Sequence, residues 1–213
     1  NLLLRFVPEE ALGGLYEALL EAGLALPEAH TLLDITRCPG ADTCNLAITR
    51  SRGLAQALEA HLSALPLAQD PGAKAIGVKI SGCPNSCGQH HIADIGFYGS
   101  SRKVGEREVP HYVLLLGGRT REGEARFGQV VGRIPARRVP EAVERILKRY
   151  LEERQNGESF QAYLDRVGAA SFKPLLQDLQ EVPPYEEAPE FYQDLGAEGE
   201  AFSVQLGRGE CAV

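Results

Sequence analysis

A chain of 213 residues is long enough to bury a substantial core, as one domain or as one domain with extensions. Its hydrophobic content of 44% and charged content of 24% are ordinary for a soluble globular protein, and no run of roughly 18 apolar residues supplies a membrane helix. The apolar run at residues 2–4 is too short for a signal peptide, so we expect a cytoplasmic protein that does not bind membranes. Because the first residue is not Met, we expect a fragment or processed piece of a longer protein.

The net charge of −7 is unevenly distributed along the chain. Residues 101–140 contain nine Lys or Arg and four Glu, whereas residues 181–213 contain eight Asp or Glu and a single Arg. We interpret the middle of the chain as a surface that can face an anionic ligand and residues 181–213 as an acidic extension. Two solvated surfaces of opposite sign explain the same pattern equally well.

The first elements expected in chain order are a short strand over residues 2–6 and a helix that opens at Val7 and Pro8 and ends at Gly23. Both resemble the last pieces of a unit that begins upstream. The apolar patterns that follow predict five strands, the third and fourth joined by a charged hairpin loop, over residues 32–36, 75–80, 92–99, 109–116 and 126–134. Further helices are expected over residues 54–64, 140–154, 160–164 and 174–179, with irregular structure after residue 182.

Four of the five cysteines form two pairs, each of which follows an expected strand. Cys38 and Cys44 lie in the run T-R-C-P-G-A-D-T-C, and Cys83 and Cys87 lie in S-G-C-P-N-S-C-G-Q. Loops at the ends of two strands of one sheet can bring four thiols together. An odd number of cysteines without a signal peptide argues against a disulfide framework and favours thiolate metal ligands in a reducing compartment.

Three interpretations of the four thiols remain open from their spacing. Zinc knuckles usually separate their ligands by about two to four residues, so C-x5-C fits a structural zinc site poorly. Cysteines that only fill a core rarely lie beside turn formers such as Pro39 and Gly40. Four thiolates on two irregular loops suit an iron–sulfur cubane, whose irons lie farther apart than the ligand positions around one ion.

The segment G-C-P-N-S-C, followed after six residues by D-I-G-F at residues 94–97, resembles the signature of the siroheme-dependent sulfite and nitrite reductases. The C-x5-C spacing and the distance between the pairs match as well, and the resemblance runs to about residue 179. It implies an α+β fold with a mixed five-stranded sheet and terminal helices packed on one face. It also implies a 4Fe-4S cluster bound by Cys38, Cys44, Cys83 and Cys87, with Cys87 bridging to the siroheme iron.

The resemblance also implies an activity and a set of cofactor contacts. The family reduces sulfite to sulfide or nitrite to ammonia with six electrons, supplied singly by ferredoxin or a similar donor. Siroheme carries eight carboxylates, so the surrounding protein must supply cations and hydrogen-bond donors. The candidates are Arg37 and Arg50 beside the first cysteine pair, Asn85 within the second pair, and Arg119.

Other residues near the motif have lesser roles in this interpretation. Gly82 and Gly88 are expected to let the backbone pass close to the cofactors, where a side chain would collide. His90 and His91 are not expected to bind iron, because the bridging thiolate fills the proximal position in the family. Cys211 is expected to be an unligated thiol.

The resemblance divides the chain into the end of a ferredoxin-like half-domain (residues 1–28), a cluster- and siroheme-binding domain (residues 29–180) and an acidic C-terminal extension (residues 181–213). In the family, the residues that bind the substrate anion come largely from the N-terminal half of the enzyme. We therefore assign no catalytic residue in this chain, and expect that half as its partner. The alternatives are a haem-free 4Fe-4S electron-transfer module and a zinc-stabilised interaction domain, and no nucleic-acid partner is expected.

Overall fold

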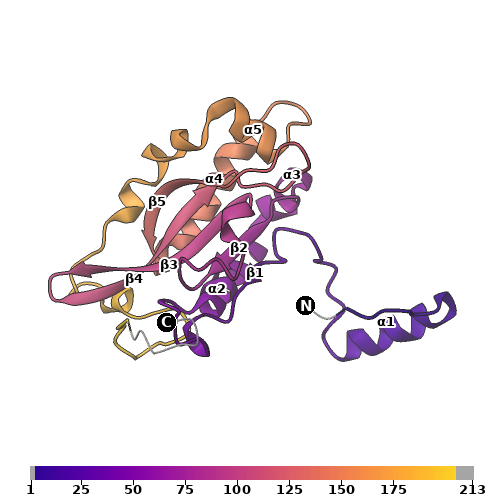
Figure 1. Cartoon of the computed structure of the whole chain (residues 1–213), viewed down its shortest axis with the longest axis horizontal. Helices are drawn as coiled ribbons and strands as arrows, with labels where there is room; N and C mark the ends of the chain where they lie inside the picture. The colour runs from indigo at the N-terminus through magenta and orange to yellow at the C-terminus, as the bar shows by residue number, and fades with distance from the viewer. Residues whose placement is uncertain (1–2, 205–213) are drawn as a thin grey trace.

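The structure, a computed structural model, describes residues 3–204. Its centre is a five-stranded mixed sheet in which the strands follow one another in chain order (Figure 1). This arrangement confirms the α+β fold and the five strands expected from the sequence. The strands are β1 (Thr36–Arg37), β2 (Val78–Ser81), β3 (Ile95–Val104), β4 (Arg107–Leu116) and β5 (Gln129–Pro135).

The direction of the strands determines where the two cysteine pairs lie. Strands β1, β2 and β3 are parallel, with Thr36 opposite Lys79 and Val78 opposite Ile95, whereas β4 runs antiparallel to both β3 and β5. Parallel strands end at the same edge of a sheet. The chain that leaves β1 at Cys38 therefore lies beside the chain that leaves β2 just before Cys83.

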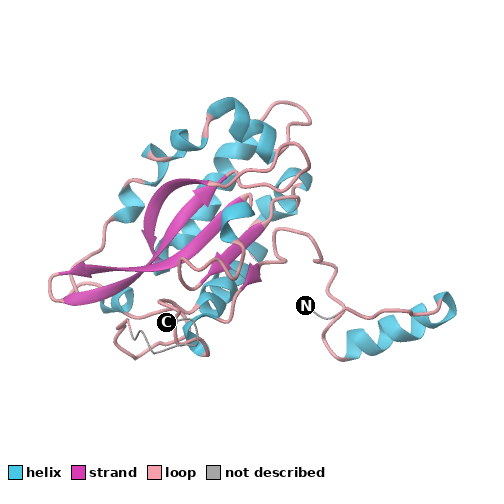
Figure 2. Ribbon diagram, in the orientation of Figure 1, coloured by secondary structure: helices cyan, strands magenta, loops and turns pink. Residues whose placement is uncertain are grey.

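Two helices, α2 (Ser51–Ser63) and α4 (Val139–Glu153), cover one face of the sheet (Figure 2). Their apolar residues recur every three or four positions, as in an amphipathic helix, and pack with the buried sheet residues Phe97 and Tyr112. Helix α5 joins this core through Phe160, whose ring meets the ring of Tyr150 on α4 edge to face. The helices are α1 (Leu12–Glu21), α2 (Ser51–Ser63), α3 (Pro71–Lys74), α4 (Val139–Glu153) and α5 (Phe160–Val167).

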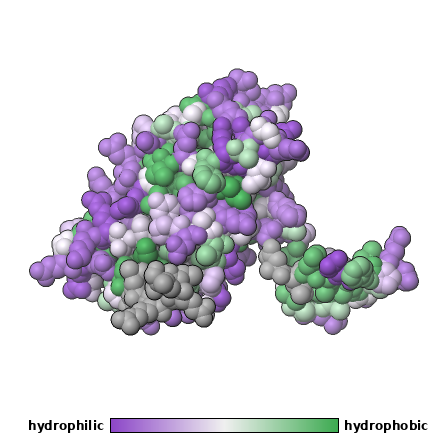
Figure 3. Space-filling view, viewed as in Figure 1, coloured by the Kyte–Doolittle hydropathy of each residue, from purple (hydrophilic) through white to green (hydrophobic). Residues whose placement is uncertain are grey.

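Helix α1 lies apart from the sheet (Figure 1). It ends as expected before Gly23, whose φ of 68° is the left-handed conformation common after a helix. None of its residues is buried, and Leu12, Tyr16 and Leu20 are each about half exposed. Figure 3 shows the apolar side chains gathered on this segment. These side chains form an apolar stripe on α1 that nothing within residues 3–204 covers.

The structure corrects two of the expected strands. Residues 3–6 of the expected first strand are not extended into a strand, and Phe6 has a φ of 58° and is almost fully exposed. The strand expected over residues 32–36 is reduced to β1, because Leu32 lies in a turn, where it is fully buried and its N–H bonds the carbonyl of Lys74.

Two further expectations about the chain after β2 are also corrected. Residues 100–108, expected as a charged hairpin loop, belong mostly to β3 and β4, and only Gly105 and Glu106 form the turn. This end of the hairpin protrudes into solvent (Figure 1). Residues 174–180 form 3-10 turns in place of an α-helix, and the side chain of Arg145 on α4 binds the carbonyl of Leu175 in this segment.

The C-terminal segment, by which we mean residues 181–204, packs against the body of the protein. The guanidinium of Arg107 on β4 lies over the ring of Tyr185 in this segment. Within the segment, the hydroxyl of Tyr192 donates to the carbonyl of Pro183. Asp194 and Leu195 are buried. Cys211 lies outside the described residues. Within residues 3–204, no helix has the length and apolar character needed to cross a membrane.

Candidate metal centre

Two loops that follow β1 and β2 meet at the edge of the sheet. We call them the first cysteine loop (residues 38–49) and the second cysteine loop (residues 82–89). The N–H of Gly82 donates to the Sγ atom of Cys38 over 3.1 Å. The carbonyl of the same glycine accepts the N–H groups of Ile48 and Thr49, over 2.8 and 3.0 Å. One residue of the second loop, Gly82, is therefore held by both ends of the first loop.

The four cysteines of these loops are free thiols. Burial raises the pKa of the Cys83 thiol; the N–H of Asn85 acts against this, and the negative charges of Cys38, Cys44 and Cys87 raise it further. Cys38, Cys44 and Cys87 thus all lie near enough to Cys83 to affect the ionisation of its thiol. Among residues 3–204, no three His, Cys, Asp or Glu side chains converge as they would around a single metal ion.

The thiols differ in their exposure to solvent. Cys83 is buried, Cys38 and Cys44 are half-buried, and Cys87 is exposed. The second loop reaches this arrangement through Ser86, which has a φ of 61° in the left-handed region. Cys87 is therefore the thiol most open to a group that approaches from outside the two loops.

Glycines allow the two loops to pack at very short range. A Cβ atom on Gly82 would lie 2.7 Å from the carbonyl oxygen of Thr49, and one on Gly88 would lie 1.9 Å from that of Ile80. Gly40 also has a φ of 65°, with the backbone nitrogen of Ser51 2.5 Å from its would-be Cβ. The close approaches at Gly82 and Gly88 are therefore made to the protein's own backbone, which explains these glycines without a cofactor contact.

Ser81, the last residue of β2, and His90, which follows the second cysteine loop, hold that loop in place. The Oγ atom of Ser81 accepts the N–H of Gly88 over 3.0 Å and lies 2.8 Å from Nδ1 of His90. His90 is fully buried; burial and then the charge of His91 lower its pKa to about 4, so its ring is neutral at pH 7. Its Nε2 atom has no hydrogen-bond partner in the described part of the chain.

Helix α2 fixes the first loop. The hydroxyl of Ser51, the first residue of α2, donates to the carbonyl of Cys38 over 2.7 Å and lies 3.5 Å from its Sγ atom. The preceding N–H, that of Arg50, donates to the carboxylate of Asp194 over 2.7 Å. Ser51, Ser81 and Asp194 are thus site residues that sequence reasoning missed. No spacing signal identifies them, because serine and aspartate recur throughout the chain.

The four polar residues predicted to contact siroheme fall into two groups. Arg37 and Asn85 are exposed and flank cysteines of the two loops. Arg50 instead binds the carbonyl of Gly196 over 3.0 Å and approaches the carboxylate of Glu200 at 3.4 Å. Its guanidinium thus faces the C-terminal segment.

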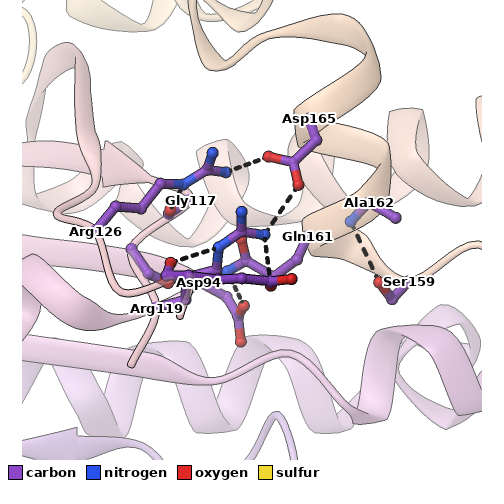
Figure 4. A network of polar contacts seen from close by, with 10 residues as sticks. Asp94, Gly117, Arg119, Arg126, Ser159, Gln161, Ala162 and Asp165 are labelled. Carbon is purple, nitrogen blue, oxygen red and sulfur yellow. Dashed lines mark hydrogen bonds and ion pairs between the residues drawn. The ribbon is translucent and has the colours of Figure 1, made fainter. Parts of the chain in front are cut away.

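Arg119 lies in a separate polar network (Figure 4). Its guanidinium binds Asp165 over 2.9 Å, and Arg126 binds the other oxygen of the same carboxylate. Burial opposes ionisation of Asp165, but the hydrogen bonds from both arginines hold its pKa below the ordinary value. Arg119 is therefore already engaged by a carboxylate of its own chain.

Asp94, the first residue of the D-I-G-F motif, anchors the start of β3 (Figure 4). Its carboxylate accepts the N–H of Gly77 over 2.7 Å and also binds the side-chain amide of Gln161. That amide donates to the carbonyl of Gly118 as well, over 2.9 Å. The motif residue thus joins β2, β3 and α5, and sets the sheet from which the second cysteine loop emerges.

Comparison with known proteins identifies a family and several similar proteins. The family model described as "Nitrite and sulphite reductase 4Fe-4S domain" matches residues 28–182. The chain is 28% identical over 171 residues to "Sulfite reductase [ferredoxin] 1" of Mycolicibacterium paratuberculosis, which covers 78% of the chain and 31% of that protein. It is 30% identical to "Ferredoxin--nitrite reductase" of Synechococcus elongatus over 123 residues. This alignment covers 56% of the chain and 22% of the Synechococcus protein.

A solved structure is similar as well. The NirA protein of Mycobacterium tuberculosis superposes with a TM-score of 0.63 and 27% identity, over 76% of this chain and 30% of that one. The chain thus spans between about a fifth and a third of the length of these curated relatives, 22% of the Synechococcus protein and 31% of the Mycolicibacterium protein. The chain belongs to the family of nitrite and sulphite reductase 4Fe-4S domains, whose cofactors are a 4Fe-4S cluster and siroheme.

Proposed function

We propose that this chain is the cluster- and siroheme-carrying part of a six-electron reductase of sulfite or nitrite. The observation that carries the proposal is the hydrogen bond from Gly82 to the sulfur of Cys38, which ties the two cysteine loops together. The donor set fits the cofactor, because four thiolates are the usual ligands of a 4Fe-4S cluster. We assign these ligands to Cys38, Cys44, Cys83 and Cys87.

Cys87 is the proposed bridge to siroheme. Its thiol is exposed while that of Cys83 is buried, so only Cys87 of the second pair is open to a flat group outside the loops. Arg37 and Asn85 are exposed next to the cysteines and would supply a cation and an amide donor to siroheme carboxylates. Arg50 and Arg119 stay predictions as siroheme contacts, since both already pair with carboxylates of the chain.

When bound, siroheme with its cluster would supply an iron site for the substrate anion and for electrons delivered one at a time. The chain's own contribution is to hold the thiolates in place. The N–H of Gly82 points at the sulfur of Cys38 and would donate to it when it binds a cluster. Hydrogen bonds to cluster sulfurs are one means by which a protein sets a cluster's potential. Ferredoxin or a similar one-electron donor is the proposed partner, and the cytoplasm the proposed location.

The proposed domain division follows from the same assignment. Residues 29–180 form the cluster- and siroheme-binding domain, and residues 181–213 an acidic extension. Residues 1–28 would end a ferredoxin-like half-domain completed by the N-terminal half of the enzyme. The exposed apolar stripe of α1, with Leu12, Tyr16 and Leu20, supports this, because such a stripe is normally covered in a stable fold.

An absorption spectrum of the longest natural protein that contains this chain, produced anaerobically in cells that make siroheme, tests the proposal. We expect tetrapyrrole bands together with about four iron and four sulfide in the cluster. Cluster absorption without tetrapyrrole bands would show a haem-free electron carrier. Zinc in place of iron and sulfide would contradict the proposal altogether.

A further inference from the structure

The C-terminal segment lies against the first cysteine loop. Together they enclose a cavity of about 350 Å³, whose walls include Cys44 and Ile48 from the loop and Phe202 from the segment. The packing with α2 is equally close, since a Cβ atom on Gly53 would lie 1.9 Å from the carbonyl oxygen of Leu195. The segment is therefore fitted to the start of α2 and to the loop before it.

Asp194 is the polar centre of this contact. It is only 4% exposed. One oxygen of its carboxylate accepts the N–H of Arg50 over 2.7 Å, and the other accepts the N–H of Leu195 over 2.9 Å. Arg50 is the N-cap residue of α2, and its own side chain makes no capping hydrogen bond. An N–H group at the start of the helix is thus satisfied by a carboxylate 144 positions further along the chain.

A short path of contacts leads from this cap to the cysteines. Ser51 follows Arg50 directly, and its hydroxyl bonds the carbonyl of Cys38 while lying 3.5 Å from the sulfur. Thr49 precedes Arg50, and its carbonyl accepts the N–H of Ala41 within the first cysteine loop over 3.0 Å. Residues on both sides of the capped N–H therefore hold the loop.

We propose that Asp194 is a positioning residue for the metal centre: by binding the N–H of Arg50 it fixes the start of α2, and through Ser51 it fixes Cys38. The inference rests on the proposed function for the identity of the bound group. The contacts from Asp194 to Cys38 are present in the chain without any bound group. The C-terminal segment is on this view part of the cluster-binding unit, and not only an appended extension.

Two measurements on the full chain test this positioning role. The first is the rate at which an iron chelator removes iron from the reconstituted protein. The second is the rate at which iodoacetamide alkylates Cys38 and Cys44 in the metal-free protein. For Asp194→Ala, both rates should rise about tenfold, the factor that corresponds to losing one buried helix-cap hydrogen bond. Asp194→Glu, which keeps the carboxylate, should recover part of this loss.

Two control variants separate positioning from general stability. Glu200→Gln changes an exposed carboxylate of the same segment and should leave both rates within about twofold of wild type. Leu176→Ala removes a fully buried core side chain and should lower the unfolding temperature without accelerating alkylation of the two cysteines at 20 °C or below.

The outcomes are distinguishable. Alkylation rates for Asp194→Ala that match wild type, or that match those of Leu176→Ala, would overturn the positioning role. A wild-type chain that takes up no iron and sulfide would overturn the proposed function, while the alkylation rates would still decide whether Asp194 fixes the loop.

Discussion

The Sγ atom of Cys38 accepts a 3.1 Å hydrogen bond from the N–H of Gly82, 44 positions away in the chain. Gly82 directly precedes Cys83, so this bond joins the first cysteine pair to the second. A Cβ atom on Gly82 would lie 2.9 Å from the Cα atom of Gly40, so neither loop can move far without disturbing the other. The two pairs are therefore held as one unit.

Replacing Cys44 by Ala is expected to abolish cluster binding with little change in fold. Cys44 is half-buried at the end of a 3-10 turn and outside the hydrophobic core, so its loss costs little packing. Iron and labile-sulfide analysis after anaerobic reconstitution should fall at least about fivefold below wild type, because one of four thiolate ligands is missing. Cys211→Ala is the matched control and should retain wild-type iron. Equal iron content in both variants would contradict the ligand assignment.

Replacing Gly88 by Ala should destabilise the protein by about 2 kcal/mol or more, because the added Cβ atom would lie 1.9 Å from the backbone oxygen of Ile80. Backbone must shift to relieve this contact, which also moves the neighbouring Cys87. Urea denaturation measures the loss of stability. Gly14→Ala is the control, because its Cβ atom would meet nothing within 4 Å and it lies inside α1. A midpoint for Gly88→Ala equal to that of the control would refute the packing argument.

The buried ring of His90 predicts a pH dependence of stability. Its pKa falls from 6.5 to about 4 on folding, so between these values the unfolded chain binds a proton that the folded chain does not. The free energy of unfolding is therefore unaffected by this group above pH 6.5, and it falls by up to about 3 kcal/mol as the pH drops towards 4. The free energy of unfolding of His90→Gln should therefore vary less between pH 7 and pH 4 than that of wild type. If the free energy of unfolding of His90→Gln changed between pH 7 and pH 4 by as much as that of wild type, the assignment of this pH dependence to His90 would be contradicted.

The carboxylate shared by Arg119 and Arg126 should contribute modestly to stability. Asp165→Asn is expected to lower the free energy of unfolding by about 1 kcal/mol, because the network is partly exposed and water screens it. Thermal unfolding measures the change. Glu124→Gln removes a more distant partner of Arg119, at 3.8 Å, and should cost less than about 0.5 kcal/mol. Identical effects of the two substitutions would argue against a specific role for Asp165.

The cysteine positions and the sheet could be predicted because their signals are local. Each pair is bounded by turn formers and follows an apolar run, and the strand order matches chain order. The lengths of β3 and β4 could not be predicted, because their protruding ends are polar on both faces and lack the alternation of a half-buried strand.

The residues that hold the cysteine loops in place, Ser51, Ser81 and Asp194, could not be predicted from the sequence for a different reason. Asp194 lies in an acidic stretch that favours a solvated extension, yet its carboxylate is buried against Arg50, 144 positions earlier. Ser51 and Ser81 likewise act through contacts with residues distant in sequence or across a turn. A long-range hydrogen bond leaves no periodic pattern, so only the folded structure reveals it.

Mössbauer spectroscopy of the chain reconstituted anaerobically with iron-57 and sulfide tests most directly whether the two loops bind one cluster. Four thiolates facing a common centre predict the spectrum of a single tetranuclear cluster, with about four iron per chain. A spectrum of isolated iron ions, or of a two-iron cluster on either cysteine pair alone, would contradict the account.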